Sequence, residues 1–158
     1  MYADNALVIS VDLKIIIRKQ LEKYWKIKEA LIAPLNIYLG NKVSHVILEG
    51  SAKAWSLSSS QYVQASVANV KKYLTKRDMR LPKKASSPLT DGYRPELDTT
   101  PKLNKSEASY YISLVGILRW IVELNRIDIA IEVSMMASVI ALPRKGHLDQ
   151  LFHMFGFL

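Results

Sequence analysis

The strongest constraint on the fold is an apolar stripe in residues 109–124. Apolar side chains recur there at steps of three and four, the spacing of one face of an α-helix. They are Tyr111, Leu114, Val115, Leu118, Ile121 and Val122. Ser106 is the predicted N-cap, and Glu107 favours the positive start of the helix. With a break near Asn125, this stretch is predicted to be the central helix of a core.

The first part of the chain mixes helix and strand patterns. An Asp-Asn pair followed by apolar residues predicts a strand–turn–strand in residues 1–10. Asp12 is a predicted cap for a helix over 13–24. Residues 35–48 are predicted to form a strand that turns back into a partner strand at 54–57.

The second part is predicted to be helical on both sides of a proline-rich connector. Ser60 caps a predicted helix from residue 61 to about residue 76, and its apolar seam lies at steps of four, three and four. Residues 81–105 contain four prolines, so they form neither a regular helix nor a central strand. A connector of this length is either packed against a neighbour or mobile. Two more helices are predicted, over 129–142 and from about residue 148.

These patterns predict an α+β fold in which N-terminal β-hairpins with an intervening helix precede a mostly helical subdomain. The predicted parts are residues 1–58 with the hairpins, 59–80 with one helix, the connector 81–105, and the helical subdomain 106–158.

Composition excludes several classes of protein. The 158 residues are 49% hydrophobic, which suits a globular core, and none is cysteine. Disulfides, thiolate nucleophiles and zinc fingers are therefore excluded. No apolar run is long enough to span a membrane, and the N-terminus carries Asp4 and Asp12 without a basic segment. We therefore expect no signal peptide, no membrane partner and a cytoplasmic or nuclear location.

Basic charge is concentrated ahead of the last helical segment. The net charge is +8, and residues 71–105 hold ten Lys or Arg against four acids, whereas residues 106–158 hold four against five. Residues 13–28 add six Lys or Arg against one Glu. This asymmetry fits one part that faces a polyanion and another that packs. Simple solvation of helix surfaces by lysine explains it as well, and both interpretations stay open.

Four short motifs occur in the order of a known family. In chain order, residues 38–40 read Tyr-Leu-Gly and residues 111–118 read Tyr-Ile-Ser-Leu-Val-Gly-Ile-Leu. Residues 126–129 then read Arg-Ile-Asp-Ile, and residues 143–148 follow a Pro-x-x-x-His-Leu pattern. This series resembles the reverse transcriptase of copia-type long-terminal-repeat retrotransposons, from the palm hairpin through thumb-like helices. The family's usual Arg-Pro-Asp is Arg-Ile-Asp here.

The resemblance implies a role for Asp4. The segment Tyr2-Ala3-Asp4-Asn5 is similar to the Tyr-x-Asp-Asp of the palm hairpin, with Asn5 in place of the second Asp. In the family, such carboxylates hold the Mg²⁺ ions that activate the primer hydroxyl and neutralise the triphosphate. Asp4 is thus the implied catalytic and metal-binding residue of a degenerate site. From the residues alone, the Asp-Asn pair is an ordinary turn.

A cluster of cations ends the helix that resembles the start of the thumb. Lys71, Lys72, Lys76 and Arg77 are the candidate nucleic-acid-binding residues, with an RNA–DNA or DNA template–primer as the implied partner. A structural role competes with this one, because cations also stabilise the negative end of a helix.

Three other positions have two interpretations each. Trp55 is a packing residue of a hairpin or a platform for a base. Asp128 and Glu132 are a helix cap and a solvated acid, or a catalytic carboxylate pair. His147 is a capping or packing residue, or a general base. The structural interpretation is favoured for each of them.

The resemblance therefore indicates a fragment of a reverse transcriptase, whose family carries out RNA-directed DNA polymerisation by two-metal nucleotidyl transfer. No segment matches the fingers or the upstream palm Asp, and Asn5 replaces a ligand, so we expect the chain alone to be catalytically inactive. The alternative is a non-catalytic remnant that grips a template–primer. A third possibility is a product that needs other polyprotein segments to fold.

Overall fold

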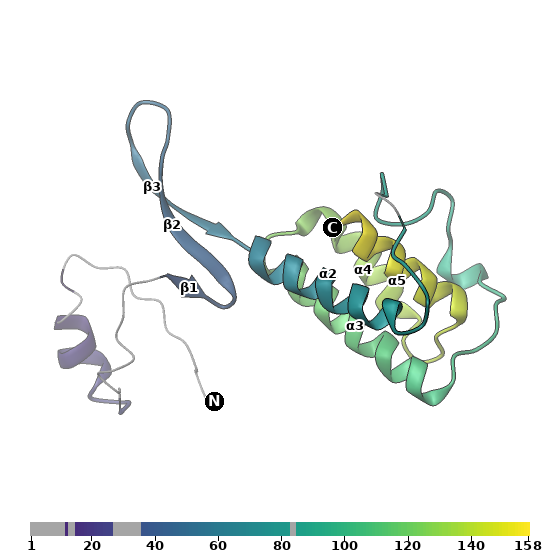
Figure 1. Ribbon diagram of the computed structural model, residues 1–158. Helices are drawn as coiled ribbons and strands as arrows, with labels where there is room; N and C mark the ends of the chain where they lie inside the picture. Colours follow the sequence, from purple (N-terminus) through teal and green to yellow (C-terminus); the bar gives the residue numbers. More distant parts are fainter. Residues whose placement is uncertain (1–11, 13–14, 27–35, 83–84) are drawn as a thin grey trace. The chain divides into compact units, whose positions relative to one another are not determined.

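The computed structural model describes residue 12 and residues 15–26, 36–82 and 85–158 (Figure 1). The chain divides into two compact units, Met1–Leu57 and Ser58–Leu158. A three-stranded antiparallel sheet and several helices confirm the predicted α+β class. No helix of the described residues is long and apolar enough to span a membrane. The hairpin predicted for residues 1–10, including Asp4 and Asn5, lies outside the described residues.

A short π-helical segment, η1 (Ile16–Leu21), is the first described element of the N-terminal unit. Asp12 caps it as predicted, since Asp12 Oδ1 accepts a hydrogen bond from Ile15 N–H at 3.1 Å. The backbone N–H groups of Tyr24 and Trp25 both donate to the Leu21 carbonyl, which closes the segment in a turn. The helix therefore ends at Leu21, three residues before the predicted end.

The sheet has the strand order β1 (Ile37–Tyr38), β2 (Asn41–Ile47) and β3 (Lys53–Ser58). The prediction of one continuous strand over 35–48 is wrong for the described residues 36–48. Leu39 and Gly40 both have positive φ, at 49° and 86°, and form a two-residue turn that pairs Tyr38 with Asn41. Positive φ at both central residues is the geometry of tight hairpin turns, and glycine adopts it at little cost.

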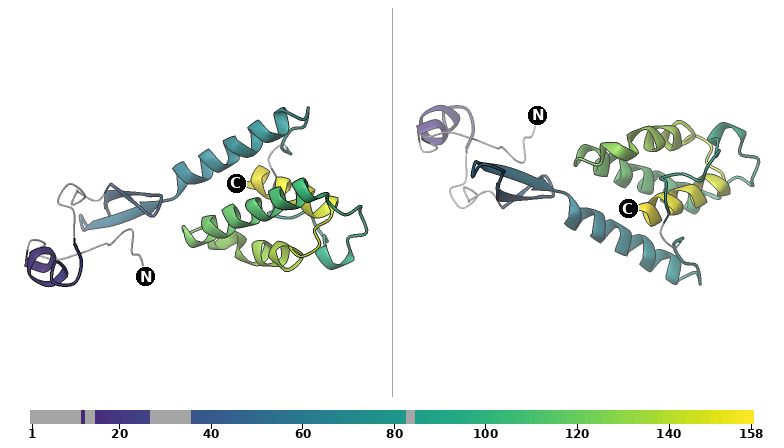
Figure 2. Two further views of the ribbon diagram at one scale, coloured as in Figure 1. Left: turned by 90° about the horizontal axis from the view of Figure 1, so that it is seen from below. Right: turned by 90° about the horizontal axis from the view of Figure 1, so that it is seen from above.

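The helical unit is built around α3 (Lys105–Glu123) (Figure 2). This helix packs against α2 (Ser60–Thr75), α4 (Ala130–Ser138) and α5 (Lys145–Phe157). The predicted stripe on α3 faces this core, and all its members except the half-buried Val122 are buried. The phenol of Tyr111 also donates to the Met136 carbonyl at 2.7 Å, so it joins α3 to α4.

Helix ends differ from the predicted ones where a side-chain partner decides the position. The N-cap of α3 is Asn104 and not Ser106: Asn104 Oδ1 accepts from Glu107 N–H, and Glu107 Oε2 accepts from Asn104 N–H, both at 3.0 Å. This reciprocal pair requires Glu at the third helical position. Glu107 occupies that position when Asn104 is the cap, but not when Ser106 is. The end of α3 is as predicted, because Asn125 breaks the helix with a φ of 90°.

The helix after this break is shorter than predicted. A 3₁₀ turn, η4 (Ile127–Ile129), precedes α4, and α4 ends at Ser138 and not at Leu142. Single turns then lead to Pro143, since Ile140 N–H donates to Ala137 and Leu142 N–H donates to Val139. Proline disfavours helix in the residue before it, and β-branched residues such as Ile140 add little helix propensity.

Residues 85–104 of the predicted connector 81–105 are packed against α5 and the residue Pro143 just before it, so the packed alternative is confirmed for these residues. It contains one 3₁₀ turn, η3 (Pro95–Leu97). Backbone hydrogen bonds join Leu103 N–H to the Pro143 carbonyl and Lys145 N–H to the Pro101 carbonyl, at 3.1 and 2.9 Å. Further along, Gln150 Oε1 accepts from both the N–H and the hydroxyl of Thr90.

Candidate functional site

The metal site implied by the resemblance cannot be placed, because Asp4 and Asn5 lie outside the described residues. Within residues 15–26, 36–82 and 85–158, no three His, Cys, Asp or Glu side chains gather in a way that could hold a metal ion.

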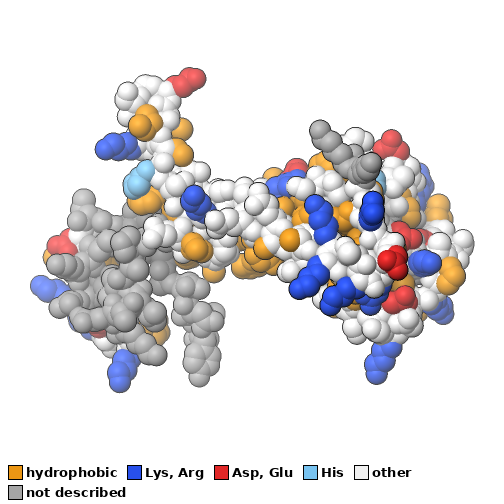
Figure 3. All heavy atoms as spheres, viewed as in Figure 1, with side chains coloured by type: hydrophobic (Ala, Val, Ile, Leu, Met, Phe, Trp, Pro, Cys, Tyr) orange, Lys and Arg blue, Asp and Glu red, His pale blue; other side chains and the backbone are white. Residues whose placement is uncertain are grey.

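The four candidate cations of α2 fall on two sides of the helix. Lys72, Lys76 and Arg77 line one groove, between α2 and α3. Lys71 lines a different groove, between α2 and α5. Figure 3 shows Lys and Arg side chains gathered over the C-terminal half of α2. The structure thus brings three of the four candidates together and separates Lys71 from them.

The α2–α3 groove combines an apolar floor with a cationic rim. Its volume is about 370 Å³. Its lining residues are Asn69, Val70, Lys72, Tyr73, Lys76, Arg77, Tyr110, Leu114 and Ile117. The floor includes Val70 and Leu114, each 1% exposed, while Lys72, Lys76 and Arg77 are exposed. No acidic side chain is among the described residues that line this groove.

One wall of the groove is a stack of three planar groups. The guanidinium carbon of Arg77 lies 3.7 Å from the centre of the Tyr73 ring, and the Tyr110 ring stacks on Tyr73 at 3.7 Å with an interplanar angle of 16°. The helix explains the first contact, because residues four apart on one helix are neighbours. Arg77 Nη1 also donates to the Tyr73 carbonyl at 3.4 Å. Phe152 of α5 lies edgewise to both tyrosines, with ring centres 6.4 and 6.5 Å away.

The groove combines exposed cations with a neutral phenol. Burial and, to a lesser extent, the nearby Tyr73 raise the pKa of Tyr110 to about 12 although Arg77 opposes the shift, so the phenol is neutral at neutral pH. Within the described residues, Lys72 and Lys76 make no ion pair with a carboxylate. The groove therefore presents uncompensated positive charge beside a neutral aromatic wall.

A helix-end role accounts for part of this charge. Lys76 is the C-cap residue of α2, and Lys72 lies in the last turn. Cations in these positions stabilise the negative end of the helix whether or not a ligand binds. That role does not require the stacked tyrosines or an open groove next to them.

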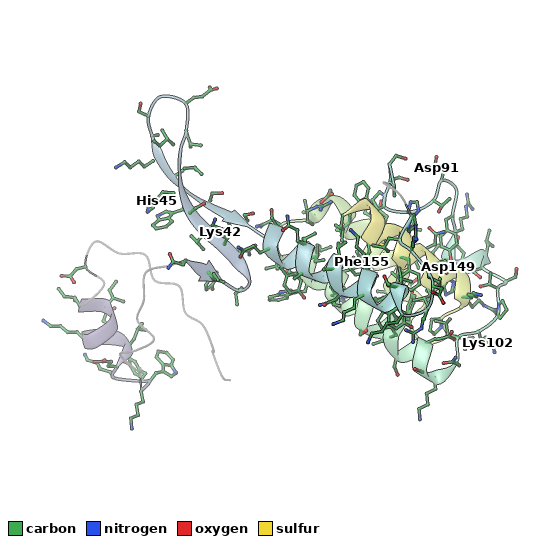
Figure 4. All side chains as sticks on the ribbon, viewed as in Figure 1. Lys42, His45, Asp91, Lys102, Asp149 and Phe155 are labelled. Carbon is green, nitrogen blue, oxygen red and sulfur yellow. The ribbon has the colours of Figure 1, made fainter. Side chains whose placement is uncertain are left out.

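The α2–α5 groove has a different character. It is about 940 Å³ in volume and is formed mainly by apolar side chains of α2 and α5, with Lys71 and Arg80 as its basic members. Phe155, which lies among the helices in Figure 4, contributes to its floor. Among the residues that the structure describes, no planar stack of the kind seen at Tyr73 accompanies its basic members.

In the N-terminal unit, Trp55 packs across the hairpin on His45. The two ring centres are 3.7 Å apart, and Trp55 is 54% exposed. Figure 4 shows His45 on this hairpin. Packing within the hairpin is the role that the sequence favoured. The pairing with His45 was not predicted, although a strand–turn–strand with known register would have placed the two residues opposite each other.

His147 belongs to a partly buried polar cluster that we call the Asp98 cluster. It comprises Tyr93, Asp98, Thr100, Arg144 and His147. His147 Nδ1 accepts from Arg144 N–H and its Nε2 lies opposite the Pro95 carbonyl as the donor, both at 3.0 Å. This confirms His147 as a capping residue of α5.

Asp98 is the centre of this cluster. Its carboxylate accepts from the Tyr93 phenol at 2.8 Å and from the Thr100 N–H and hydroxyl at 2.8 and 2.5 Å. Burial by itself would raise the pKa of Asp98, but these hydrogen bonds outweigh it and lower the pKa below the usual Asp range. Burial and the Asp98 carboxylate raise the pKa of Tyr93.

The partner of the Asp128 carboxylate is Arg126. Asp128 binds Arg126 through two hydrogen bonds of 2.8 Å, and this contact lowers the pKa of Asp128 although partial burial opposes it. The predicted capping role of Asp128 is also wrong, because Arg126 takes both carboxylate oxygens. Glu132 is not fully solvated either: its Oε2 is buried and has no hydrogen-bond partner among the described residues.

Sequence reasoning found the cations of the α2–α3 groove but missed its aromatic wall. The spacing of Tyr73 and Arg77 was a usable signal, because four residues on a helix place a guanidinium over a ring. Tyr110 gave no such signal, since its contact with Tyr73 depends on how two helices pack. Comparisons with protein families, curated proteins and solved structures find no match to this chain.

Proposed function

We propose that the helical unit binds nucleic acid through the α2–α3 groove. The observation that carries this proposal is the grouping of Lys72, Lys76 and Arg77 on one rim, beside the stacked tyrosines and without an acidic side chain among the described lining residues. Lysine and arginine bind phosphates by charge and displace condensed counterions.

We also propose that the chain is a fragment of a copia-type reverse transcriptase and is catalytically inactive alone. The order of the four short motifs supports this descent, and Asn5 in place of a carboxylate supports the loss of activity. The family's reaction, RNA-directed DNA polymerisation with Mg²⁺, needs two carboxylate-bound metal ions. A primer-extension assay of the purified chain with Mg²⁺ tests this: incorporation above background would contradict it.

Binding is tested with a fluorescent RNA–DNA hybrid in a salt series, after circular dichroism confirms that the chain is folded. Three phosphate contacts predict that the logarithm of the affinity falls with the logarithm of salt concentration with a slope of about −3. The double variant Lys72→Ala/Lys76→Ala removes two of these contacts, so its slope is expected to be smaller by about 2.

A matched control removes the same charge elsewhere. Lys102 and Lys105 are exposed, do not line the groove, and lie at the connector and the start of α3 (Figure 4). Lys102→Ala/Lys105→Ala is expected to keep the slope of the parent chain. The single variant Lys71→Ala tests the remaining candidate, for which we expect a smaller effect than for Lys72. Equal losses for the two double variants would mean that net charge, and not the groove, sustains binding.

A further inference from the structure

The α2–α3 groove has the size of a pocket for a small ligand. Its volume of about 370 Å³ lies near the lower end of the range of roughly 300–1,000 Å³ for small-molecule sites. A groove of this size admits one nucleotide, whereas a duplex can only touch its rim. In the proposed function the cations on the rim bind phosphates, but no part of the ligand has yet been assigned to the groove itself.

The flat surface that this groove offers is the outer face of Arg77. Both faces of the Tyr73 ring are already covered, one by the Arg77 guanidinium and the other by Tyr110. The guanidinium carbon lies over the ring, 3.7 Å from its centre, and Arg77 Nη1 donates to the Tyr73 carbonyl at 3.4 Å. Arg77 is exposed, so the face turned away from Tyr73 is open to a ligand. A guanidinium held in this way is preorganised for stacking on a base.

The other lining residues match the remaining parts of a nucleotide. Lys72 and Lys76 are four residues apart on α2, so their ammonium groups flank Tyr73 and Arg77 along one side of the helix. Asn69, one turn before Tyr73, is exposed and offers a donor and an acceptor to the edge of a base. Val70, Leu114 and Ile117 give the groove an apolar floor.

We propose that the α2–α3 groove holds one unpaired nucleotide, with its base stacked on Arg77 and its phosphate bound by Lys72 and Lys76. This inference rests on the proposed function and adds a substrate class to it: single-stranded nucleic acid is preferred over a duplex. In a duplex each base is already stacked and paired, so its face is not available to Arg77.

The test compares a fluorescent single strand of twelve nucleotides with an RNA–DNA hybrid of the same length, using the full chain at one salt concentration. Arg77→Lys keeps the positive charge and removes the flat group. We expect about a ten-fold loss of affinity for the single strand and no change for the hybrid, with the salt dependence unaltered. Arg80→Lys is the matched control, because Arg80 is exposed and lines the other groove.

A second pair of variants tests the groove without touching a charge. Asn69→Leu puts a branched apolar side chain at the mouth and removes the amide. Gln61→Leu makes a similar change near the start of α2, at an exposed position that lines neither groove. The first is expected to weaken single-strand binding several-fold and the second to leave it unchanged.

The outcomes separate this inference from the proposed function. A single-strand preference that Arg77→Lys and Asn69→Leu both reduce supports the nucleotide site. Equal affinity for the two ligands, insensitive to both variants, overturns the nucleotide site and leaves the proposed nucleic-acid binding in place. Absence of binding to either ligand by folded protein overturns both.

Discussion

The Asp98 cluster and the α2–α3 groove both gather polar side chains in the helical unit, yet they differ in where those side chains find partners. In the Asp98 cluster, the carboxylate accepts three hydrogen bonds and both nitrogens of His147 are bonded. In the groove, Lys72 and Lys76 have no carboxylate partner among the described residues. A polar group that the protein satisfies by itself stabilises the fold, and one that it leaves open can bind a ligand.

The largest change in stability is expected at Gly146, where the Asp98 cluster leaves no space for a side chain. A Cβ atom at Gly146 would overlap Asp98 Oδ2, so Gly146→Ala must displace a buried carboxylate from its donors. We expect a loss of about 2–4 kcal/mol in the free energy of unfolding, measured by urea denaturation followed by circular dichroism. Gly116→Ala is the matched control, because a Cβ there meets nothing within 4 Å. It should raise stability by about 0.5–1 kcal/mol.

Asp98→Asn tests whether the charge matters as well as the space. We expect a loss of about 1–3 kcal/mol at neutral pH, because the amide replaces an acceptor with a donor that faces other donors. The pKa of Asp98 is lowered by folding, so its stabilisation is present above the unfolded Asp pKa of about 3.9 and is lost as pH falls through the folded value. The difference in stability between parent and variant should therefore shrink below about pH 4. A difference that stays constant down to pH 2 would contradict the charged role.

Tyr93→Phe should have a smaller effect of the same kind. It removes the phenol that donates to Asp98 Oδ2 at 2.8 Å and leaves the two bonds from Thr100. We expect a loss of about 0.5–1.5 kcal/mol, with the acid-induced loss of stability beginning at a higher pH than in the parent chain. Acid titration of the circular dichroism signal measures both. A lower onset would mean that Tyr93 does not stabilise the ionised carboxylate.

The smallest change in stability is expected in the groove. Lys72→Ala/Lys76→Ala removes exposed groups without a carboxylate partner among the described residues, so the free energy of unfolding should stay within about 0.5 kcal/mol of the parent value. The same variant should lose most of the salt-sensitive binding. A large loss of stability would instead assign these lysines to the helix end, as in the structural interpretation of the sequence.

Sequence patterns predicted the parts of this fold that depend on neighbours within one helix. The apolar stripe from Tyr111 to Ile121 predicted which face of α3 lies in the core, and Asn125 predicted where the helix ends. The patterns were less reliable where two signals compete within a few residues. Asn104 and Ser106 are both good caps, and the reciprocal bond with Glu107 decides between them. Residues 35–48 alternate like one strand, yet Leu39 and Gly40 form a turn.

The candidate site was predicted only in part because its members come from different elements. Lys72, Lys76 and Arg77 are visible as a cluster in the sequence, but the separation of Lys71 from them depends on which helices flank α2. Tyr110 is 37 positions after Tyr73, and nothing in the sequence places the two rings together. The same holds for Asp98 and His147, whose meeting requires the connector to lie along α5.

The contacts between the connector and α5 have a consequence for how the chain folds. Hydrogen bonds join Pro95 to His147, Ser87 to His153 and Thr90 to Gln150, over separations of 52, 66 and 60 residues. Contacts this distant close large loops, whose entropy must be overcome before the bonds form. During synthesis the connector leaves the ribosome well before α5 does, so it has no partner until the last helix appears. The four prolines of the connector restrict its backbone in that interval, which lowers the entropy lost when α5 finally binds it.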